Sequence, residues 1–64
     1  MINKDSDVTK EFVKKIFNAT HKRWYVEHAL GMVQNDDDMR KIISYLDTKQ
    51  EVTWQDIEYK ILTL

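Results

Sequence analysis

The stretch Glu51-Val-Thr-Trp-Gln-Asp-Ile-Glu-Tyr-Lys-Ile-Leu62 carries the most complete helix-start signal in the chain. Thr53 is a residue type that caps helix N-termini, and Asp56 stands three positions later, where its carboxylate can reach back as in a capping box. Val52 and Ile57 have the spacing of a hydrophobic staple around this cap. Three start signals therefore agree on a helix that begins directly after Thr53.

The rest of the chain also favours helices. It has no proline and one glycine, so little interrupts helix formation, and no segment alternates between β-branched and polar residues. The predicted fold is therefore all-α, a compact bundle of three to four short helices. The chain is expected to divide into a flexible tail of residues 1–5 and a single domain of residues 6–64, with helices over 7–18, 20–31, 36–47 and 54–63.

The first two apolar segments face different directions. The first consists of Val8, Phe12, Val13, Ile16 and Phe17, and the second of Tyr25, Val26, Ala29, Leu30, Met32 and Val33. At about 100° per residue, the second arc is rotated by about 130° from the first. A straight helix cannot bury both arcs in one core, so we predict a break near Asn18 to His21, where Asn and Thr supply caps. A single long helix with partners on two sides is the alternative.

The second half begins with a glycine and an acidic cluster. Gly31 lies outside the second arc and is expected to end that helix. The run Asn35 to Asp38 is expected to cap the third helix, because its spacing fails the pattern of a calcium-binding loop. The buried residues of the last two helices are predicted to be Met39, Ile42, Ile43 and Leu46, followed by Trp54, Ile57, Ile61 and Leu64.

Composition excludes several function classes. Ten basic and eleven acidic residues give a formal net charge of −1, with +2 on residues 1–30 and −3 on residues 31–64. This balance disfavours a dedicated nucleic-acid or membrane-surface protein.

No apolar run approaches the roughly 20 residues of a membrane span, and the polar N-terminal sequence does not resemble a signal peptide, so a cytoplasmic location is expected. Richness in Lys, Ile and Asn is typical of bacterial and phage proteins from AT-rich genomes.

Catalytic and metal-binding patterns are missing from the sequence. It has no cysteine, no nucleophile motif and no glycine-rich phosphate loop. His21 and His28 are seven residues apart, about 10 Å along a helix, which is too far to share one metal ion. We therefore expect a protein that is not an enzyme, with no cofactor, no metal and no small-molecule substrate.

Trp24 is the sharpest candidate for partner binding. Together with His21 and His28 it lies opposite the core arc of the second helix, and tryptophan is over-represented at binding hot spots. An unbroken first helix would instead bury Trp24, because it is in phase with Phe17. Tyr59 and Leu62 on the last helix form a second candidate surface. The expected partner is another protein, with a second copy of this chain as one candidate.

Nucleic-acid binding is the alternative function. The basic face of the first helix and its continuation would supply the contacts, through Lys10, Lys14, Lys15, Lys22 and Arg23. The segment from Met39 onward also resembles the first two helices of a helix-turn-helix or winged-helix domain. That resemblance implies a recognition helix after the Thr53-led one, but the sequence ends at Leu64. Its last helix carries Lys60 as its single cation, which disfavours a DNA-reading role.

Overall fold

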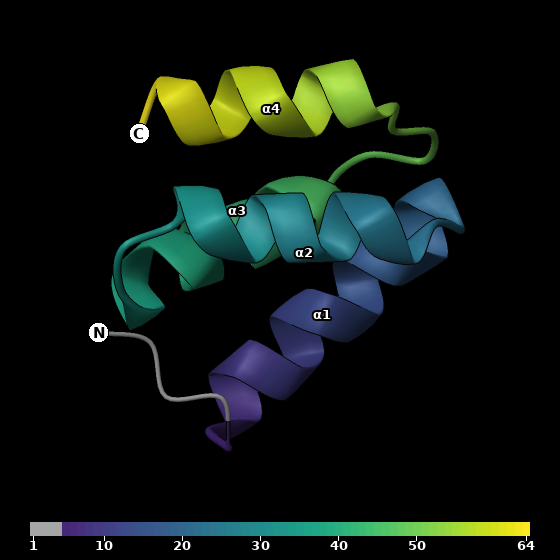
Figure 1. Ribbon diagram of the computed structural model, residues 1–64. Coiled ribbons are helices and arrows are strands. Elements are labelled where there is room, and N and C mark those ends of the chain that lie inside the picture. Colours follow the sequence, from purple (N-terminus) through teal and green to yellow (C-terminus); the bar gives the residue numbers. More distant parts are fainter. Residues whose placement is uncertain (1–4) are drawn as a thin grey trace.

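Four helices follow one another in the computed structural model, which describes residues 5–64 (Figure 1). They are α1 (Asp7–Thr20), α2 (Arg23–Met32), α3 (Asp36–Asp47) and α4 (Trp54–Leu62). No strand occurs in residues 5–64, and the helices pack against one another, so the prediction of a small all-α bundle is confirmed. Most of the predicted tail, residues 1–4, lies outside the described part of the chain.

The predicted break falls at His21 and Lys22. His21 adopts a left-handed conformation with φ 58° and ψ 20°, and its N–H donates to the carbonyl of Phe17 at 2.6 Å. Lys22 is extended, with φ −133° and ψ 126°, and α2 begins at the next residue. The alternative of one uninterrupted helix is therefore wrong.

The capping at this corner differs from the prediction. Thr20 does not cap α2; its hydroxyl donates instead to the carbonyl of Ile16, at 2.8 Å, and so satisfies an acceptor at the end of α1. The N-cap residue of α2 is Lys22, which makes no side-chain cap. Because α1 extends to Thr20 and two residues, His21 and Lys22, form the corner, α2 begins at Arg23 rather than at residue 20.

One core collects side chains from all four helices. Its buried apolar residues are Phe12 and Ile16 from α1, Val26 and Ala29 from α2, Val33 from the following loop, Met39, Ile42 and Leu46 from α3, and Ile57 and Ile61 from α4. Both apolar arcs thus reach the same interior, which the corner at His21 makes possible. Burying each of these large aliphatic side chains contributes about 1.5–3 kcal/mol before entropic costs.

Three predictions about individual residues are wrong. Phe17 is 45% exposed because it lies about 100° around α1 from Ile16, beyond the faces that α2 and α3 cover. Leu64 is also exposed because α4 ends at Leu62, so the terminal residue no longer follows the helical stripe. Gly31 does not end α2, which continues to Met32 and ends where the N–H of Val33 donates to the carbonyl of Ala29.

The caps of α3 and α4 match the sequence patterns. Asn35 caps α3, where its side-chain oxygen accepts from the N–H of Asp38 at 2.9 Å. In α4 the Thr53 hydroxyl accepts from the N–H of Asp56, and the Asp56 carboxylate accepts from the N–H of Thr53, at 3.3 and 3.2 Å. Val52 is half-buried against the core, as the predicted staple requires.

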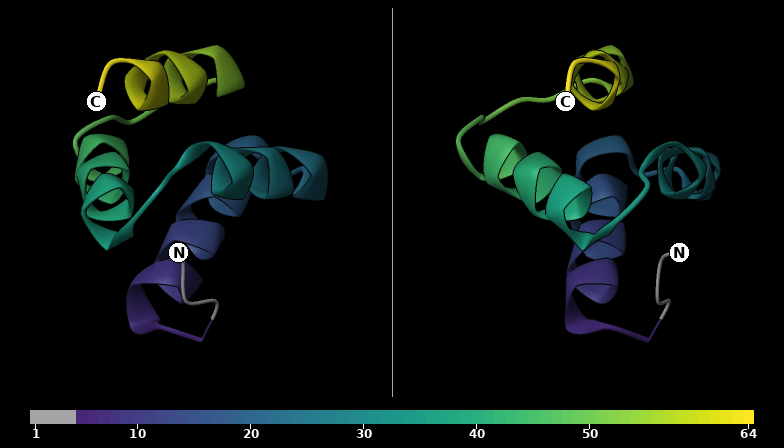
Figure 2. Two further views of the ribbon diagram at one scale, coloured as in Figure 1. Left: turned by 60° about the vertical axis from the view of Figure 1, so that its left-hand side comes forward. Right: turned by 90° about the vertical axis from the view of Figure 1, so that its left-hand side faces the viewer.

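The helix axes explain how distant residues meet. Figures 1 and 2 show α2 and α4 side by side with nearly parallel axes, both running in the same direction, while α1 and α3 cross them. The first turns of α2 and α4 therefore lie at the same end of the molecule. Trp24 and Trp54, which are 30 positions apart in the sequence, start from neighbouring places.

The left-handed residue at the corner gives a stability prediction. His21→Gly should raise the free energy of unfolding by up to about 1 kcal/mol, because glycine adopts positive φ without a Cβ clash. His21→Val should lower it by about 1–2 kcal/mol, because a β-branched side chain disfavours this conformation. Urea denaturation of the three proteins measures the order. Equal stability of the Gly and Val variants would contradict the left-handed corner.

Candidate functional site

Four rings from α2 and α4 meet at the end of the molecule where both helices begin. They belong to Trp24, Tyr25 and His28 of α2 and to Trp54 of α4, and we call this set the aromatic surface. Helical spacing of four residues places His28 one turn after Trp24 on the same side of α2. Trp54 is the first residue of α4, directly after its cap, so the Thr53 capping box positions its backbone.

Two ring stacks build this surface. Tyr25 and Trp54 are stacked at 4.8 Å between centroids, with planes 18° apart, and so join α2 to α4. Trp24 and His28 are stacked at 5.2 Å with planes 9° apart. Edge contacts link the two stacks, including His28 to Trp54 at 5.4 Å. Aromatic pairs of this kind contribute about 0.5–1.5 kcal/mol beyond their buried area, so the surface is a preformed unit.

The stack of Tyr25 and Trp54 is less exposed to solvent than the stack of Trp24 and His28. Tyr25 and Trp54 are half-buried and pack against the hydrophobic core. Trp24 is 61% exposed, and His28 is exposed beside it. An indole held by neighbouring rings loses little further entropy when a partner covers it, so the geometry is suited to protein contact.

The structure brings together only part of the predicted partner surface. Trp24 and His28 are in contact, as their spacing predicts. His21 lies apart, because α2 begins after it; it lines a cleft beside Lys15 and Asp47 instead. Tyr59 and Leu62 are 70% and 71% exposed on α4, and the ring contacts found in residues 5–64 do not connect Tyr59 to the aromatic surface.

Sequence reasoning missed Tyr25 and Trp54 as members of this site. The sequence pattern predicts both residues on the buried faces of their helices. Both are half-buried against the core, but they also contact the outer rings of Trp24 and His28. The adjacency of Tyr25 to Trp24 was a usable signal. The contribution of Trp54 depends on the parallel arrangement of α2 and α4, which no local pattern specifies.

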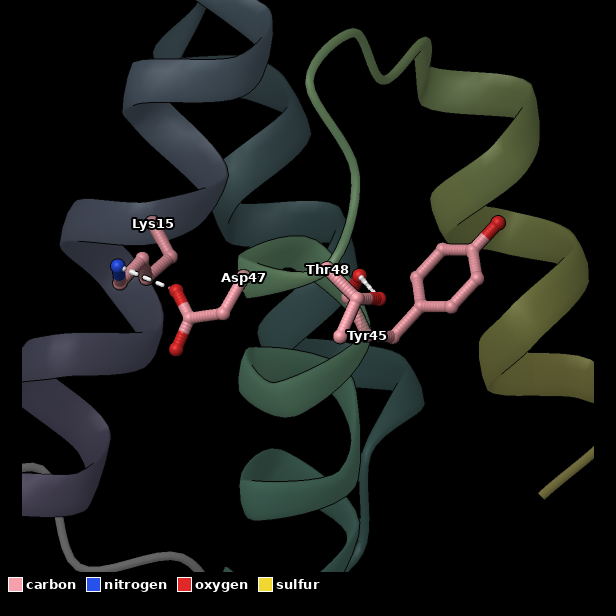
Figure 3. Close-up of polar contacts among 4 residues, drawn as sticks. All are labelled: Lys15, Tyr45, Asp47 and Thr48. Carbon is pink, nitrogen blue, oxygen red and sulfur yellow. Dashed lines mark hydrogen bonds and ion pairs between the residues drawn. The ribbon is translucent and has the colours of Figure 1, made fainter.

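The predicted basic residues are in two different situations. Lys15 is engaged in an ion pair, in which its Nζ lies 2.6 Å from Oδ1 of Asp47 and links α1 to α3 (Figure 3). The other four, Lys10, Lys14, Lys22 and Arg23, are exposed. Lys22 and Arg23 directly precede Trp24, so two cations lie next to the exposed indole in the sequence.

A cleft lies at the corner, away from the aromatic surface. This cleft, of about 430 Å³, lies between the C-terminal ends of α1 and α3 and the loop before α4. Its lining mixes the Lys15–Asp47 pair with His21, Lys49 and Glu51. Within residues 5–64, no group of three or more His, Cys, Asp or Glu side chains is arranged to hold a metal ion, and no helix has the length and hydropathy of a membrane span.

Comparison of this sequence and structure with protein-family models, with curated proteins and with solved structures finds no significant match. The function must therefore be inferred from the residues and their geometry.

The Lys15–Asp47 pair gives a pH prediction. The hydrogen bond and charge of Asp47 raise the pKa of Lys15 above its usual 10.5. A raised pKa in the folded state means that the pair stabilises the fold below about pH 10.5, and that this stabilisation is lost as the pH rises through the folded-state pKa. Asp47→Asn should return the pKa of Lys15 toward 10.5, as measured by NMR titration of its side-chain methylene resonances. An unchanged pKa would contradict the pair.

Proposed function

We propose that this protein acts as a small interaction module that binds another protein through the aromatic surface of α2 and α4. The observation that carries the proposal is the position of Trp24, which is 61% exposed although it is stacked on His28. Monomeric proteins rarely leave large apolar side chains grouped at the surface without a function, and tryptophan is the residue type most enriched at hot spots. A bacterial or phage adaptor, inhibitor or regulatory subunit fits these properties.

The geometry favours a protein surface over a small ligand. The rings are stacked on one another at 4.8 to 5.4 Å, so no ligand-sized space separates them. Neither of the hollows described in the molecule is lined by Trp24 or Trp54. An exposed, rigid group of rings instead supplies the centre of an interface, which neighbouring polar residues can surround.

The small core supports the same proposal. A chain of 64 residues buries only roughly 60% of its unfolded surface, so its own stability is limited. Binding a partner in the folded state adds stability by mass action. A second copy of this chain is one form that such a partner could take.

Trp24→Ala should strongly weaken partner binding while the fold persists. Truncation of a central tryptophan costs about 2 kcal/mol or more, roughly thirtyfold in affinity. The measurement is capture from the native cell with wild type, Trp24→Ala and Leu62→Ala, followed by titration calorimetry with the purified partner. Circular dichroism should show equal helix content in all three proteins.

The Leu62→Ala control removes an exposed apolar side chain of the second surface. Retained binding in this variant and loss in Trp24→Ala would support the aromatic surface. Equal binding by all three proteins would contradict it, and so would unfolding of Trp24→Ala, because Trp24 would then be a structural residue. Sedimentation of the wild-type protein at several concentrations tests whether the partner is a second copy of this chain.

Nucleic-acid binding is the second candidate, supported by the cations Lys22 and Arg23 next to the exposed indole. A cationic groove with an aromatic stacking platform is how many proteins hold single strands. If this function is correct, binding of a single-stranded oligonucleotide should fall steeply with salt, and charge reversal at Lys14 and Lys22 should remove it. Fluorescence anisotropy measures both effects. The absence of any signal at about 50 mM salt would exclude this function.

A further inference from the structure

Two ammonium groups lie near the ring of Tyr45, and a third lysine lines the groove beside this ring, between α3 and α4. The Nζ of Lys49 lies 4.9 Å from the Tyr45 ring centroid, and the Nζ of Lys60 lies 5.6 Å from it. Lys41 lines the same groove. Figure 3 shows the Tyr45 side chain extending from α3 toward α4. Residues 31–64 contain four cations, and two of them, Lys41 and Lys60, line this groove although the segment carries a net charge of −3.

Neither Lys41 nor Lys60 forms an ion pair in residues 5–64, whereas the charge of Asp56 acts on Lys49. The ion pairs found there are Lys15–Asp47 and Arg40–Asp37. The groove, of about 290 Å³, is lined by Lys41, Ser44, Tyr45, Thr48 and Lys60, with no acidic residue among them. Lys49 lines the corner cleft instead, together with Asp47 and Glu51, whose carboxylates would repel an anion there. Two lysines without ion-pair partners that line one groove favour a bound anion, which would reduce their mutual repulsion.

Hydroxyl groups complete a set of donors. The side chain of Ser44 makes no hydrogen bond in the described part of the chain, so its O–H is available. Tyr45 lines the groove as well, and its O–H can donate. Thr48 differs, because its hydroxyl already donates to the carbonyl of Tyr45 at 2.8 Å.

We propose that the groove between α3 and α4 binds a phosphate group, either as inorganic phosphate or as the phosphate monoester of a small molecule. A phosphate monoester carries about −1.5 to −2 charges at pH 7 and three strong acceptor oxygens, which match ammonium and hydroxyl donors arriving from two helices. The groove, of about 290 Å³, is just smaller than the usual small-molecule sites of about 300–1,000 Å³, as suits a ligand as small as a phosphate group. This site shares no residue with the aromatic surface, so it can fail or hold independently of the proposed function.

Amide NMR titration of the full chain tests the site. The probes are inorganic phosphate and O-phosphoserine, with serine as the phosphate-free control and sodium chloride to keep the ionic strength constant. Saturable shifts are expected at Lys41, Ser44, Tyr45 and Lys60 with a phosphate probe, and none with serine. The relative affinities of the two probes distinguish free phosphate from a monoester.

Two variants that each remove one positive charge test where on the molecule phosphate binds. Lys60→Gln should weaken phosphate binding by about three- to fivefold, the upper range for one exposed charge pair. Lys10→Gln removes the same charge from α1 and should leave the affinity unchanged; amide spectra without ligand should show that both variants keep the fold. Shifts that do not saturate, shifts spread over Lys10 and Lys14, or equal affinities in the two variants would overturn the proposal.

Discussion

The whole structure depends on one constraint: the apolar arcs of α1 and α2 point in directions about 130° apart, yet they must reach the same core. Two residues between α1 and α2 turn the chain so that both arcs can face the core. His21 takes a left-handed conformation that ends α1, and Lys22 is extended and leads into α2. A histidine at positive φ carries a conformational cost of about 1–2 kcal/mol, which the burial of Val26 and Ala29 against Phe12 and Ile16 offsets.

The turn at His21 also determines which side chains of α2 remain exposed to solvent. A continued α1 would carry Trp24 around toward the face of Phe17. Because α2 begins anew at Arg23, its core face is instead defined by Val26 and Ala29, and Trp24 points away from the interior. The parallel course of α4 then brings Trp54 beside it, so the aromatic surface is a consequence of the fold as well as the basis of the proposed function (Figure 2).

Local patterns in the sequence were sufficient to predict much of the helix arrangement along the chain. The caps at Asn35 and Thr53 and the break before Trp24 depend on short-range chemistry, and all three were predicted. Gly31 shows the limit of such rules, because it does not adopt the positive φ of a helix-ending glycine and α2 continues to Met32. Phe17 and Trp54 could not be placed, because their exposure depends on which helices lie beside them. The approach of Lys60 to Tyr45 had no signal in sequence spacing, because Lys60 comes from another helix.

The corner itself is the most direct test of this view of the molecule. NMR coupling constants and backbone NOEs for residues 17–25 report the φ angle of His21 and the continuity of the helix. A positive φ at His21, with the run of helical NOEs interrupted between Thr20 and Arg23, is the expected result. Unbroken helical NOEs from Phe17 through Tyr25 with negative φ throughout would contradict it, and would remove the structural basis for the exposed indole.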